Sequence, residues 1–278
     1  MNKKPHIKIL ILNWNGEAII ERCLDSAVKM NYDNFSIDII DNGSEDNSIG
    51  IINQKYPNIK IHQISSNLGY SKGYNYAFDQ LKDSHFEYYL LLNNDTSISS
   101  DLLTNLYKNT LQYGERNIYG PKINFINTKK IWFSGGYYNI YSGFCKHIGI
   151  NTVEKNIMYK TQISEYISGC CMLINKELIS DLNGFDEDFN MYYEDVDLCH
   201  RASLLHSTSC YVIENSTIFH DVSYSLGQKS FKKIYYKIIS QFKFIYKSNN
   251  FIIFLISILM HVILIPIYLI FIIFKLIF

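Results

Sequence analysis

Residues 184–201, GFDEDFNMYYEDVDLCHR, combine the residue types that acid–base chemistry requires. Six carboxylates stand here against one basic side chain, Arg201, and aromatic residues are interleaved among them. Carboxylates that aromatic neighbours partly desolvate have raised pKa values, which bring them towards the range where they accept a proton in catalysis. Alternatively, Glu194, Asp195 and Asp197 are first-turn acids that stabilise a helix N-terminus, and Asp197 pairs with Arg201 one helical turn later.

Two further residues have the chemistry of metal ligands. In LLLNNDT (90–96) an apolar strand delivers Asp95 to a sheet edge, and His220 lies in TIFHDVSYS. Mg²⁺ or Mn²⁺ takes one or two protein carboxylates and completes its shell with substrate phosphates and water, and imidazole suits Mn²⁺ in a mixed N/O site. The alternatives are that Asp95 is a turn residue and that His220 is a structural hydrogen-bonding group.

A glycine-containing stretch, NLGYSKGYN (67–75), is a candidate nucleotide loop. It matches neither GxGxxG nor GxxxxGK[ST], so a Rossmann dinucleotide fingerprint and a P-loop are not supported. One interpretation is an ordinary loop that leads into a helix. In the other, Lys72 and Asn75 face a nucleotide, with Gly69 and Gly73 allowing close approach of the backbone.

The first half of the chain alternates apolar strands with amphipathic helices. Strands are predicted at 7–12, 36–40, 59–64 and 88–92, and helices at 17–30, 44–55, from about 70 to 82, and 99–113. Ser44 is a possible cap of the second helix. This βαβα order predicts an α/β fold whose mainly parallel central sheet has helices on both faces.

Three of these strands end in asparagine or aspartate. In such sheets ligands bind outside the carboxyl ends of the strands. Turn chemistry explains each residue separately, but together on one sheet edge they predict a polar binding cleft. The residues are Asn13 and Asn15, Asp41 and Asn42, and Asn93, Asn94 and Asp95.

After about residue 115 the pattern changes. Short strands and tight turns are predicted over 117–144, a buried strand at Gly169–Asn175, a helix at 194–205 and a strand at Cys210–Ile213. We expect this half to be more antiparallel than the first.

The composition excludes several classes of protein. The 278 residues include 26 Lys+Arg and 26 Asp+Glu, so no global charge points to a nucleic-acid partner. The six cysteines form no CxxC and have no regular spacing, which favours reduced thiols over a disulfide framework or a zinc site.

The C-terminal stretch predicts a membrane segment. No charged residue occurs between Phe251 and Phe274, a length sufficient to cross a bilayer, and several lysines precede it. The lysine bias predicts residues 1–250 on the cytoplasmic face of the inner membrane, held by a single C-terminal segment. Pro266 and His261 leave a re-entrant hairpin open, and a buried soluble helix is the other alternative.

This interpretation divides the chain into a catalytic domain at 1–228, a basic juxtamembrane helix at 229–250 and a hydrophobic segment at 251–278. The N-terminus does not resemble a signal peptide, because its apolar run is broken at Asn13.

Taken together, the motifs resemble a known family. ILNWNG, IIDNGSED, NLGYSKGYN, LLLNNDT, the stretch from SGCCMLI to LCHR, and FHDVSYS occur in order between residues 7 and 225. In this they are similar to family-2 glycosyltransferases of the GT-A fold, in particular the rhamnosyltransferase-like branch.

The resemblance implies a role for each candidate on the donor side. Asp41 would read the pyrimidine of a nucleotide-sugar, with Asn13 and Asn15 beside it. The remaining donor residues are implied to lie near the nucleotide, the ribose and the sugar: Lys72, Asn75, Asn93 and Asn94.

It likewise implies the metal site and the catalytic pair. Asp95 and His220 would hold Mg²⁺ or Mn²⁺, Asp195 would be the general base, and Glu194 would orient a sugar. The acid-rich metal triplet of many relatives is Asn93-Asn94-Asp95 here, which leaves one carboxylate and does not specify the metal.

The implied reaction is inverting transfer of a sugar, such as rhamnose or another hexose, from a UDP- or dTDP-sugar. The implied acceptor is a hydroxyl of a polyprenyl-diphosphate-linked glycan in the synthesis of a surface polysaccharide such as an O-antigen. Two alternatives remain. A nucleotidyltransferase would need a Gly-rich basic loop near the N-terminus, which is not evident. A membrane-tethered, non-catalytic protein would bind the nucleotide-sugar without turnover.

Overall fold

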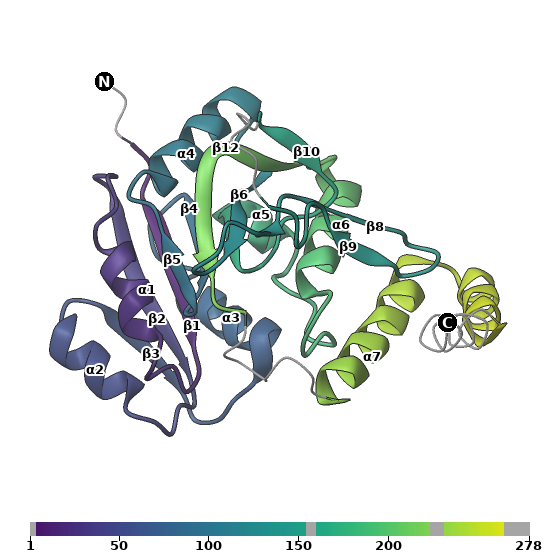
Figure 1. The fold of residues 1–278 in the computed structure, drawn as a ribbon, viewed down its shortest axis with the longest axis horizontal. Helices are drawn as coiled ribbons and strands as arrows, with labels where there is room; N and C mark the ends of the chain where they lie inside the picture. Colours follow the sequence, from purple (N-terminus) through teal and green to yellow (C-terminus); the bar gives the residue numbers. More distant parts are fainter. Residues whose placement is uncertain (1–3, 154–159, 223–230, 264–278) are drawn as a thin grey trace.

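The structure, a computed structural model, describes residues 4–153, 160–222 and 231–263. Over these residues the fold is built on one ten-stranded mixed sheet (Figure 1). Its strands follow the order β10-β12-β6-β11-β4-β1-β2-β3, with β5 paired to β12 and β7 paired to β6.

The N-terminal half of the sheet is parallel, as the βαβα order predicts. In the sheet, β1 lies between β2 and β4, and β3 pairs with β2. The register places Asn13 opposite Asp41, and Leu12 opposite Asn93, so the polar strand ends share one edge. These strands are β1 (Ile7–Asn13), β2 (Phe35–Asn42), β3 (Lys60–Ile64) and β4 (Tyr88–Asn93).

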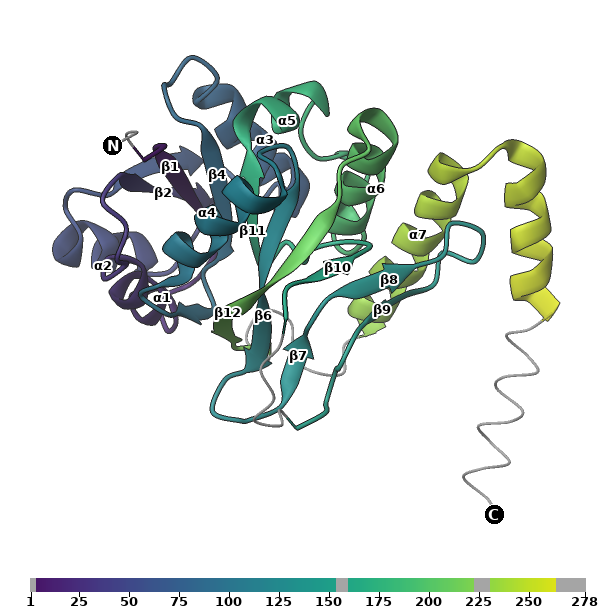
Figure 2. The same ribbon diagram turned by 90° about the horizontal axis from the view of Figure 1, so that it is seen from above.

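Helices cover both faces of the sheet, which is why β1 and β4 are buried along almost their whole length (Figure 2). One face carries α1 (Ile20–Ala27), α2 (Ser48–Lys55) and α4 (Leu102–Tyr113). The other face carries α3 (Gly69–Gln80), α5 (Lys176–Asp181) and α6 (Glu194–His206).

The second half of the sheet is partly antiparallel. The strand β11 (Cys171–Asn175) is antiparallel to both β4 and β6 (Ile118–Phe125). The long strand β12 (Cys210–His220), however, runs parallel to β6. The short strands β5 (Thr96–Ile98), β7 (Ile131–Phe133) and β10 (Gln162–Ser164) pair antiparallel with their neighbours.

An irregularity in β12 matters for the site. The register against β6 shifts between Ile213 and Thr217, where Asn215 has a left-handed φ of 56°. A bulge of this kind re-aims the strand without ending it. Consequently β12 continues to His220, which lies opposite Thr96 of β5.

Outside the main sheet, β8 (Gly136–Tyr138) and β9 (Cys145–His147) form a two-stranded hairpin. The tip of this hairpin lies beside α7 (Phe231–Ser248) in both ribbon views (Figures 1 and 2). Gln241 of α7 donates a hydrogen bond to the Ser142 carbonyl at the tip.

The expected membrane-spanning segment at 251–278 is not supported. Residues 251–263 are helical, and 264–278 lie outside the described residues. Within the described part of the chain, no helix has both the length and the apolar character needed to cross a membrane. The predicted location, on the membrane through a single C-terminal segment, is therefore wrong on this structure.

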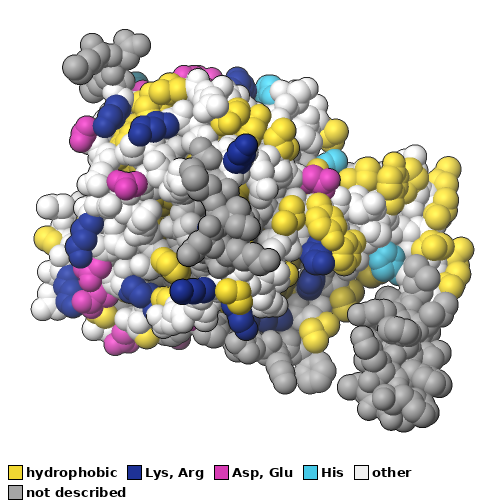
Figure 3. Space-filling view, turned by 45° about the horizontal axis from the view of Figure 1, so that its top comes forward, with side chains coloured by type: hydrophobic (Ala, Val, Ile, Leu, Met, Phe, Trp, Pro, Cys, Tyr) yellow, Lys and Arg dark blue, Asp and Glu magenta, His cyan; other side chains and the backbone are white. Residues whose placement is uncertain are grey.

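Residues 251–263 do not form a buried core helix either. Figure 3 shows hydrophobic side chains gathered at the end of the molecule that carries α7 and this segment. Phe251, Ile252 and Leu259 are each at least 60% exposed. This segment therefore packs on the outside of the fold.

Candidate functional site

The ends of β1, β2 and β4 are joined by side-chain hydrogen bonds. Asn13 is fully buried, and its amide nitrogen donates to the hydroxyls of Ser44 (3.2 Å) and Ser48 (3.0 Å). Its amide oxygen accepts from the Asn94 amide at 2.9 Å. Three of the predicted motifs thus meet at one buried asparagine.

Asn15 and Asp41 lie in the same cluster. Asn15 has a left-handed φ of 48°, and its side-chain oxygen accepts from the Glu45 amide. Asp41 is buried and accepts from the Ser44 amide. The predicted capping role of Ser44 is wrong: α2 begins at Ser48, and the Ser44 hydroxyl accepts from Asn13 and from the Asn15 amide.

Asn93 connects this cluster to the other half of the sheet. Its backbone N–H donates to the Cys170 carbonyl at 3.0 Å, and its own carbonyl accepts from Thr96. The residue beside Cys170 is Gly169, whose amide binds Asp195. The donor-side residues and the catalytic candidates are therefore only a few contacts apart.

Asp95 and His220 lie together, although they are distant in the sequence. The pairing of β5 with β12 sets His220 Nε2 3.0 Å from Asp95 Oδ1, and both residues are 6% exposed. Asp95 Oδ1 and His220 Nδ1 have no hydrogen-bond partner among the described residues. The edge of Trp132 covers the imidazole, with the ring centroids 4.6 Å apart.

This pair fits part of the coordination shell of a divalent cation. A buried carboxylate oxygen without a donor is costly unless a ligand satisfies it. No group of three or more His, Cys, Asp or Glu side chains arranged to hold a metal occurs in the part of the chain that the structure describes. One carboxylate and one imidazole suit Mg²⁺ or Mn²⁺ only if the remaining ligands come from substrate and water.

Glu194 and Asp195 begin α6 as adjacent, half-buried carboxylates. Both oxygens of Asp195 accept backbone hydrogen bonds at 2.9 Å, from Gly169 and from Val196. Glu194 Oε2, in contrast, is buried and has no hydrogen-bond partner in the described chain. The two acids therefore have different environments.

Their pKa values follow from this difference. Burial, together with the neighbouring charge of Asp195, raises the pKa of Glu194 to about 8. Burial also raises the pKa of Asp195, while the N–H groups of Gly169 and Val196 oppose this shift by stabilising its ionised form. Both carboxyls therefore hold a proton more tightly than exposed acids do, and only Asp195 has backbone donors that favour its ionised form.

The turn before these acids is strained. Tyr192 and Tyr193 both have left-handed backbone conformations, with φ of 67° and 70°. Such conformations are uncommon for non-glycine residues and persist where their surroundings enforce them. The direction in which Glu194 and Asp195 leave the turn depends on this pair.

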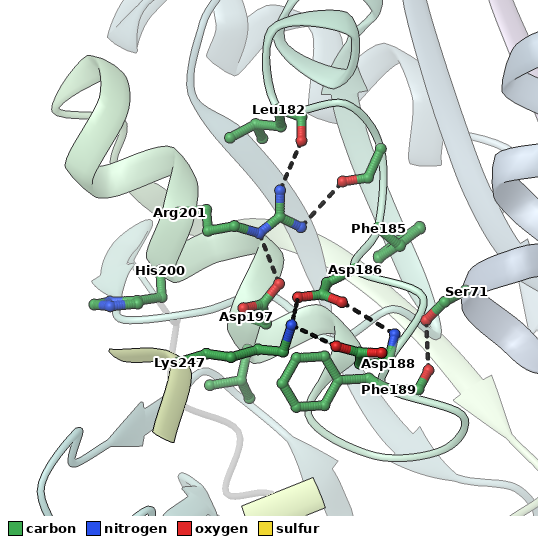
Figure 4. A network of polar contacts seen from close by, with 12 residues as sticks. Ser71, Leu182, Phe185, Asp186, Asp188, Phe189, Asp197, His200, Arg201 and Lys247 are labelled. Atoms are coloured by element: carbon green, nitrogen blue, oxygen red, sulfur yellow. Dashed lines mark hydrogen bonds and ion pairs between the residues drawn. The ribbon is translucent and has the colours of Figure 1, made fainter. Parts of the chain in front are cut away.

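Asp197 has the structural role that the alternative interpretation predicts. Arg201 donates to its carboxylate at 2.7 Å, one helical turn later, and to the carbonyls of Leu182 and Gly184 (Figure 4). The first turn of α6 therefore contains two kinds of acid. Asp197 anchors the helix, whereas Glu194 and Asp195 have no cationic partner in the described residues.

The predicted nucleotide loop forms the N-terminal half of α3, which contacts the acidic stretch. Asn75 holds the backbone of Phe185 from both sides, at 2.8 Å each, and Ser71 donates to the Phe189 carbonyl. Lys72 is exposed and acts electrostatically on Asp188. That Lys72 and Asn75 contact a nucleotide stays a prediction. The side-chain oxygen and nitrogen of Asn75 already form hydrogen bonds within the protein.

Sequence reasoning missed several residues that assemble the site. Ser44 and Ser48 orient Asn13, the Gly169 amide holds Asp195, and Trp132 covers His220. Tyr70 donates to the Gly169 carbonyl at 2.7 Å. For the serines, Gly169 and Tyr70 the only available signal was a position inside or close to a quoted motif, and Trp132 had no such signal.

Comparison with known proteins gives one family. The model of Glycosyl transferase family 2 matches residues 8–182. An N-acetylglucosaminyl-diphospho-decaprenol L-rhamnosyltransferase of Mycobacterium tuberculosis is 23% identical over 240 residues, which cover 80% of this chain and 78% of that protein.

Solved structures share the fold. GalNAc-T7 with UDP, GalNAc and Mn²⁺ superposes with a TM-score of 0.66 at 14% identity over 80% of this chain, which spans 44% of that chain. Staphylococcus aureus TarS 1–349 in complex with UDP gives a TM-score of 0.61 at 16% identity over 87% of this chain, which spans 64% of that chain.

Proposed function

Since the chain belongs to glycosyl transferase family 2, we propose that it transfers a sugar from a UDP- or dTDP-sugar to a hydroxyl of a glycan acceptor in bacterial glycan synthesis. The observation that carries this proposal is a short series of contacts. Asn94 contacts Asn13 at the donor side, Asp95 faces His220, and Asn93 is joined through Cys170 and Gly169 to Asp195.

The donor nucleotide would lie against the ends of β1 and β2. Asp41, buried beside Asn13, provides a carboxylate that can accept the ring N–H of uracil or thymine. Asn93 ends β4 at the same edge of the sheet, and Asn15 follows β1 there. The exposed Lys72 would add a positive charge near the nucleotide. A site built this way does not discriminate between the two pyrimidines, because both have that N–H.

Asp95 and His220 would hold a divalent cation together with the donor diphosphate. Bound there, Mg²⁺ or Mn²⁺ would neutralise charge that develops on the leaving nucleoside diphosphate. The buried Asp95 Oδ1 without a hydrogen-bond donor supports this role.

Asp195 would act as the general base of a single, inverting displacement. Its ionised form accepts the proton of the acceptor hydroxyl as the oxygen attacks the anomeric carbon and the bond to the diphosphate breaks. Glu194, which carries a proton near neutral pH, would donate a hydrogen bond that orients a sugar hydroxyl. No covalent intermediate is required.

The acceptor would be a polyprenyl-diphosphate-linked glycan, in the assembly of a surface polysaccharide such as an O-antigen. The name of the mycobacterial relative supports this choice of acceptor class. We also propose that the catalytic domain comprises residues 1–228 and that residues 229–250 form a separate basic helical segment.

Calorimetry on the full chain tests the proposal. A panel of UDP- and dTDP-sugars would be titrated in the presence of Mn²⁺, of Mg²⁺ and of EDTA. Metal-dependent binding of one donor, followed by release of its nucleoside diphosphate on addition of acceptor, is the expected result. A folded chain that binds no member of the panel would contradict the proposed donor class.

The same experiment, with UTP and dTTP added to the panel, separates the two alternatives. A nucleotidyltransferase would bind a nucleoside triphosphate and release pyrophosphate. A non-catalytic binding protein would bind a nucleotide-sugar and never release the diphosphate. The contrast between Glu194 and Asp195 favours the transferase, because a mere binding site gains nothing from a buried carboxyl of raised pKa beside one that two backbone N–H groups hold.

A further inference from the structure

The acidic stretch is held from outside the region that the family model matches. That match ends at residue 182, whereas α7 begins at Phe231 and packs against residues 186–193. Figure 4 shows Lys247 of α7 between two carboxylates of this stretch. Its ammonium nitrogen is 2.7 Å from Asp186 and 2.6 Å from Asp188.

Two further polar contacts from α7 reach the backbone of the same stretch. Ser240 donates to the Met191 carbonyl at 2.8 Å, and Lys243 donates to the Asp188 carbonyl at 2.6 Å. Ser240, Lys243 and Lys247 have i, i+3 and i, i+4 spacing, so they lie on one face of the helix. That face is directed at the stretch that leads into Glu194.

An apolar contact fixes the last residue of the strained turn. Phe244 is fully buried in α7, with its ring centroid 5.7 Å from that of Tyr193. The Tyr193 hydroxyl donates to the Gly143 carbonyl at the hairpin tip, which α7 also contacts through Gln241. Tyr193, the second residue of the left-handed pair, is thus enclosed between α7 and the hairpin.

We propose that α7 is a positioning element of the active site, in which Ser240, Phe244 and Lys247 enforce the left-handed Tyr192–Tyr193 turn and thereby place Glu194 and Asp195. This inference rests on the proposed function of that pair. It assigns to α7 a role in catalysis that the sequence pattern, a basic helix before an apolar segment, does not indicate. None of these three residues contacts the reacting groups directly.

Burial of Glu194 gives the proposal a readout that needs no substrate. The titratable groups that face it are Asp195, Tyr70 and Tyr192, and the pKa values of both tyrosines are raised by burial, so they remain neutral below pH 10. If α7 releases the turn, water reaches Glu194 and its pKa falls towards the ordinary value of 4.5.

Infrared spectroscopy on the full chain measures the C=O stretching band of the protonated Glu194 carboxyl as the pH is varied. The Glu194→Gln variant, which lacks this band, assigns it. The midpoint is the pH at which half of the band is lost. Lys247→Met should move the midpoint down by about one pH unit or more, because a more hydrated carboxyl ionises more readily. Lys247→Arg should restore the wild-type midpoint. Ser240→Ala, which removes a different anchor, should shift it in the same direction.

A matched control removes a lysine ion pair elsewhere. Lys82 pairs with Asp79 at 3.1 Å on the exposed end of α3, and Lys82→Met should leave the midpoint and the affinity for UDP with Mn²⁺ unchanged. Lys247→Met should also keep this affinity while the turnover number falls.

A folded Lys247→Met protein with the wild-type midpoint would overturn the proposal. The proposal would also be overturned if turnover fell only in proportion to the fraction of folded protein, measured by thermal unfolding, while the midpoint stayed unchanged. Failure of every donor to bind would refute the proposed function instead, and would leave the infrared result to stand by itself.

Discussion

His220 Nε2 lies 3.0 Å from Asp95 Oδ1, which brings the end of β12 against the loop that follows β4. The contact is short, yet the aspartate oxygen has no hydrogen-bond donor among the described residues. A carboxylate oxygen and an imidazole nitrogen at this distance can act as neighbouring ligands of one metal ion.

The first prediction concerns this pair. Asp95→Asn and His220→Ala should each weaken Mn²⁺-dependent binding of UDP by about tenfold or more, the equivalent of about 1.4 kcal/mol, because a ligand to the cation is lost. Calorimetry with Mn²⁺ and with EDTA measures the effect, which should vanish in EDTA. Asp181 forms a similar 3.0 Å contact with His206 away from the site, so Asp181→Asn is the control. Equal losses with and without metal would contradict the assignment.

The second prediction concerns the base of the nucleotide. Asp41→Ala should weaken UDP binding by about 10- to 100-fold, because a hydrogen bond to a charged acceptor contributes about 1.5–3 kcal/mol. Asp41→Asn should lose less, since the amide oxygen still accepts. Calorimetry with UDP, dTDP and ADP provides the comparison. If ADP binds the wild type as well as UDP, Asp41 does not read a pyrimidine.

The third prediction concerns proton transfer. Asp195→Asn should reduce turnover by about 10²- to 10⁴-fold, the usual contribution of a general base. Donor binding should change little, because Asp195 contacts the backbone of Gly169 and Val196 and not the donor-side residues. Release of nucleoside diphosphate from the donor found in the panel measures turnover, with the exposed Glu177→Gln as control. Near wild-type turnover in the asparagine variant would assign the base elsewhere.

The fourth prediction concerns stability and pH. The pKa of Glu194 is about 8 in the folded protein and 4.5 ordinarily, so the folded state binds more protons than the unfolded state between these values. Stability should therefore fall as pH rises through this window. Glu194→Gln removes the cost of ionising a buried carboxyl. The Tm of this variant should exceed that of the wild type by several degrees near pH 8 but not below about pH 4.5.

Calorimetric scans of wild type, Glu194→Gln and Glu177→Gln across the pH range test this expectation. The control should follow the wild type, because Glu177 is exposed on α5. A constant difference between Glu194→Gln and wild type at every pH would mean that Glu194 is not held protonated by the fold.

The fifth prediction concerns the turn after β2. Gly43 has a φ of +73°, and a Cβ there would lie 2.6 Å from the Cα of Ser66. Gly43→Ala should lower the Tm by several degrees and weaken UDP binding, because the backbone beside Asp41 must move. Gly50 in α2 would meet only the Asn47 side chain. Gly50→Ala should therefore be neutral or stabilising, and a similar loss in both variants would refute the strain argument.

Much of the N-terminal half could be predicted from the sequence because its signals are local. Apolar strands that alternate with amphipathic helices can form a parallel sheet, and the carboxyl ends of parallel strands necessarily share an edge. The structure confirms that Asn13, Asp41 and Asn94 share this edge. The helix at Glu194 and the Asp197–Arg201 pair were equally visible, since both depend on spacing within one turn.

Contacts between distant segments could not be read in this way. The parallel pairing of β12 with β6 and the bulge near Asn215 bring His220 to Asp95, and no local pattern specifies either. The hydrogen bonds between the Asn75 side chain and the backbone of Phe185, 110 residues later, are likewise invisible in the sequence. An exposed asparagine and one engaged by a remote backbone have the same sequence signature.

The C-terminal region shows most clearly what the sequence determines and what only the tertiary structure determines. Composition alone indicated a helix with lysines followed by an apolar stretch, and α7 is indeed helical. The sequence by itself determined which residues carry chemistry and the order of the elements that present them, because these depend on residue type and short-range periodicity. Only the tertiary structure decided that α7 packs on the strained turn before Glu194, and that Asp195 accepts two backbone hydrogen bonds while Glu194 Oε2 accepts none from the described residues. Burial and hydrogen bonding are set by neighbours from distant parts of the chain.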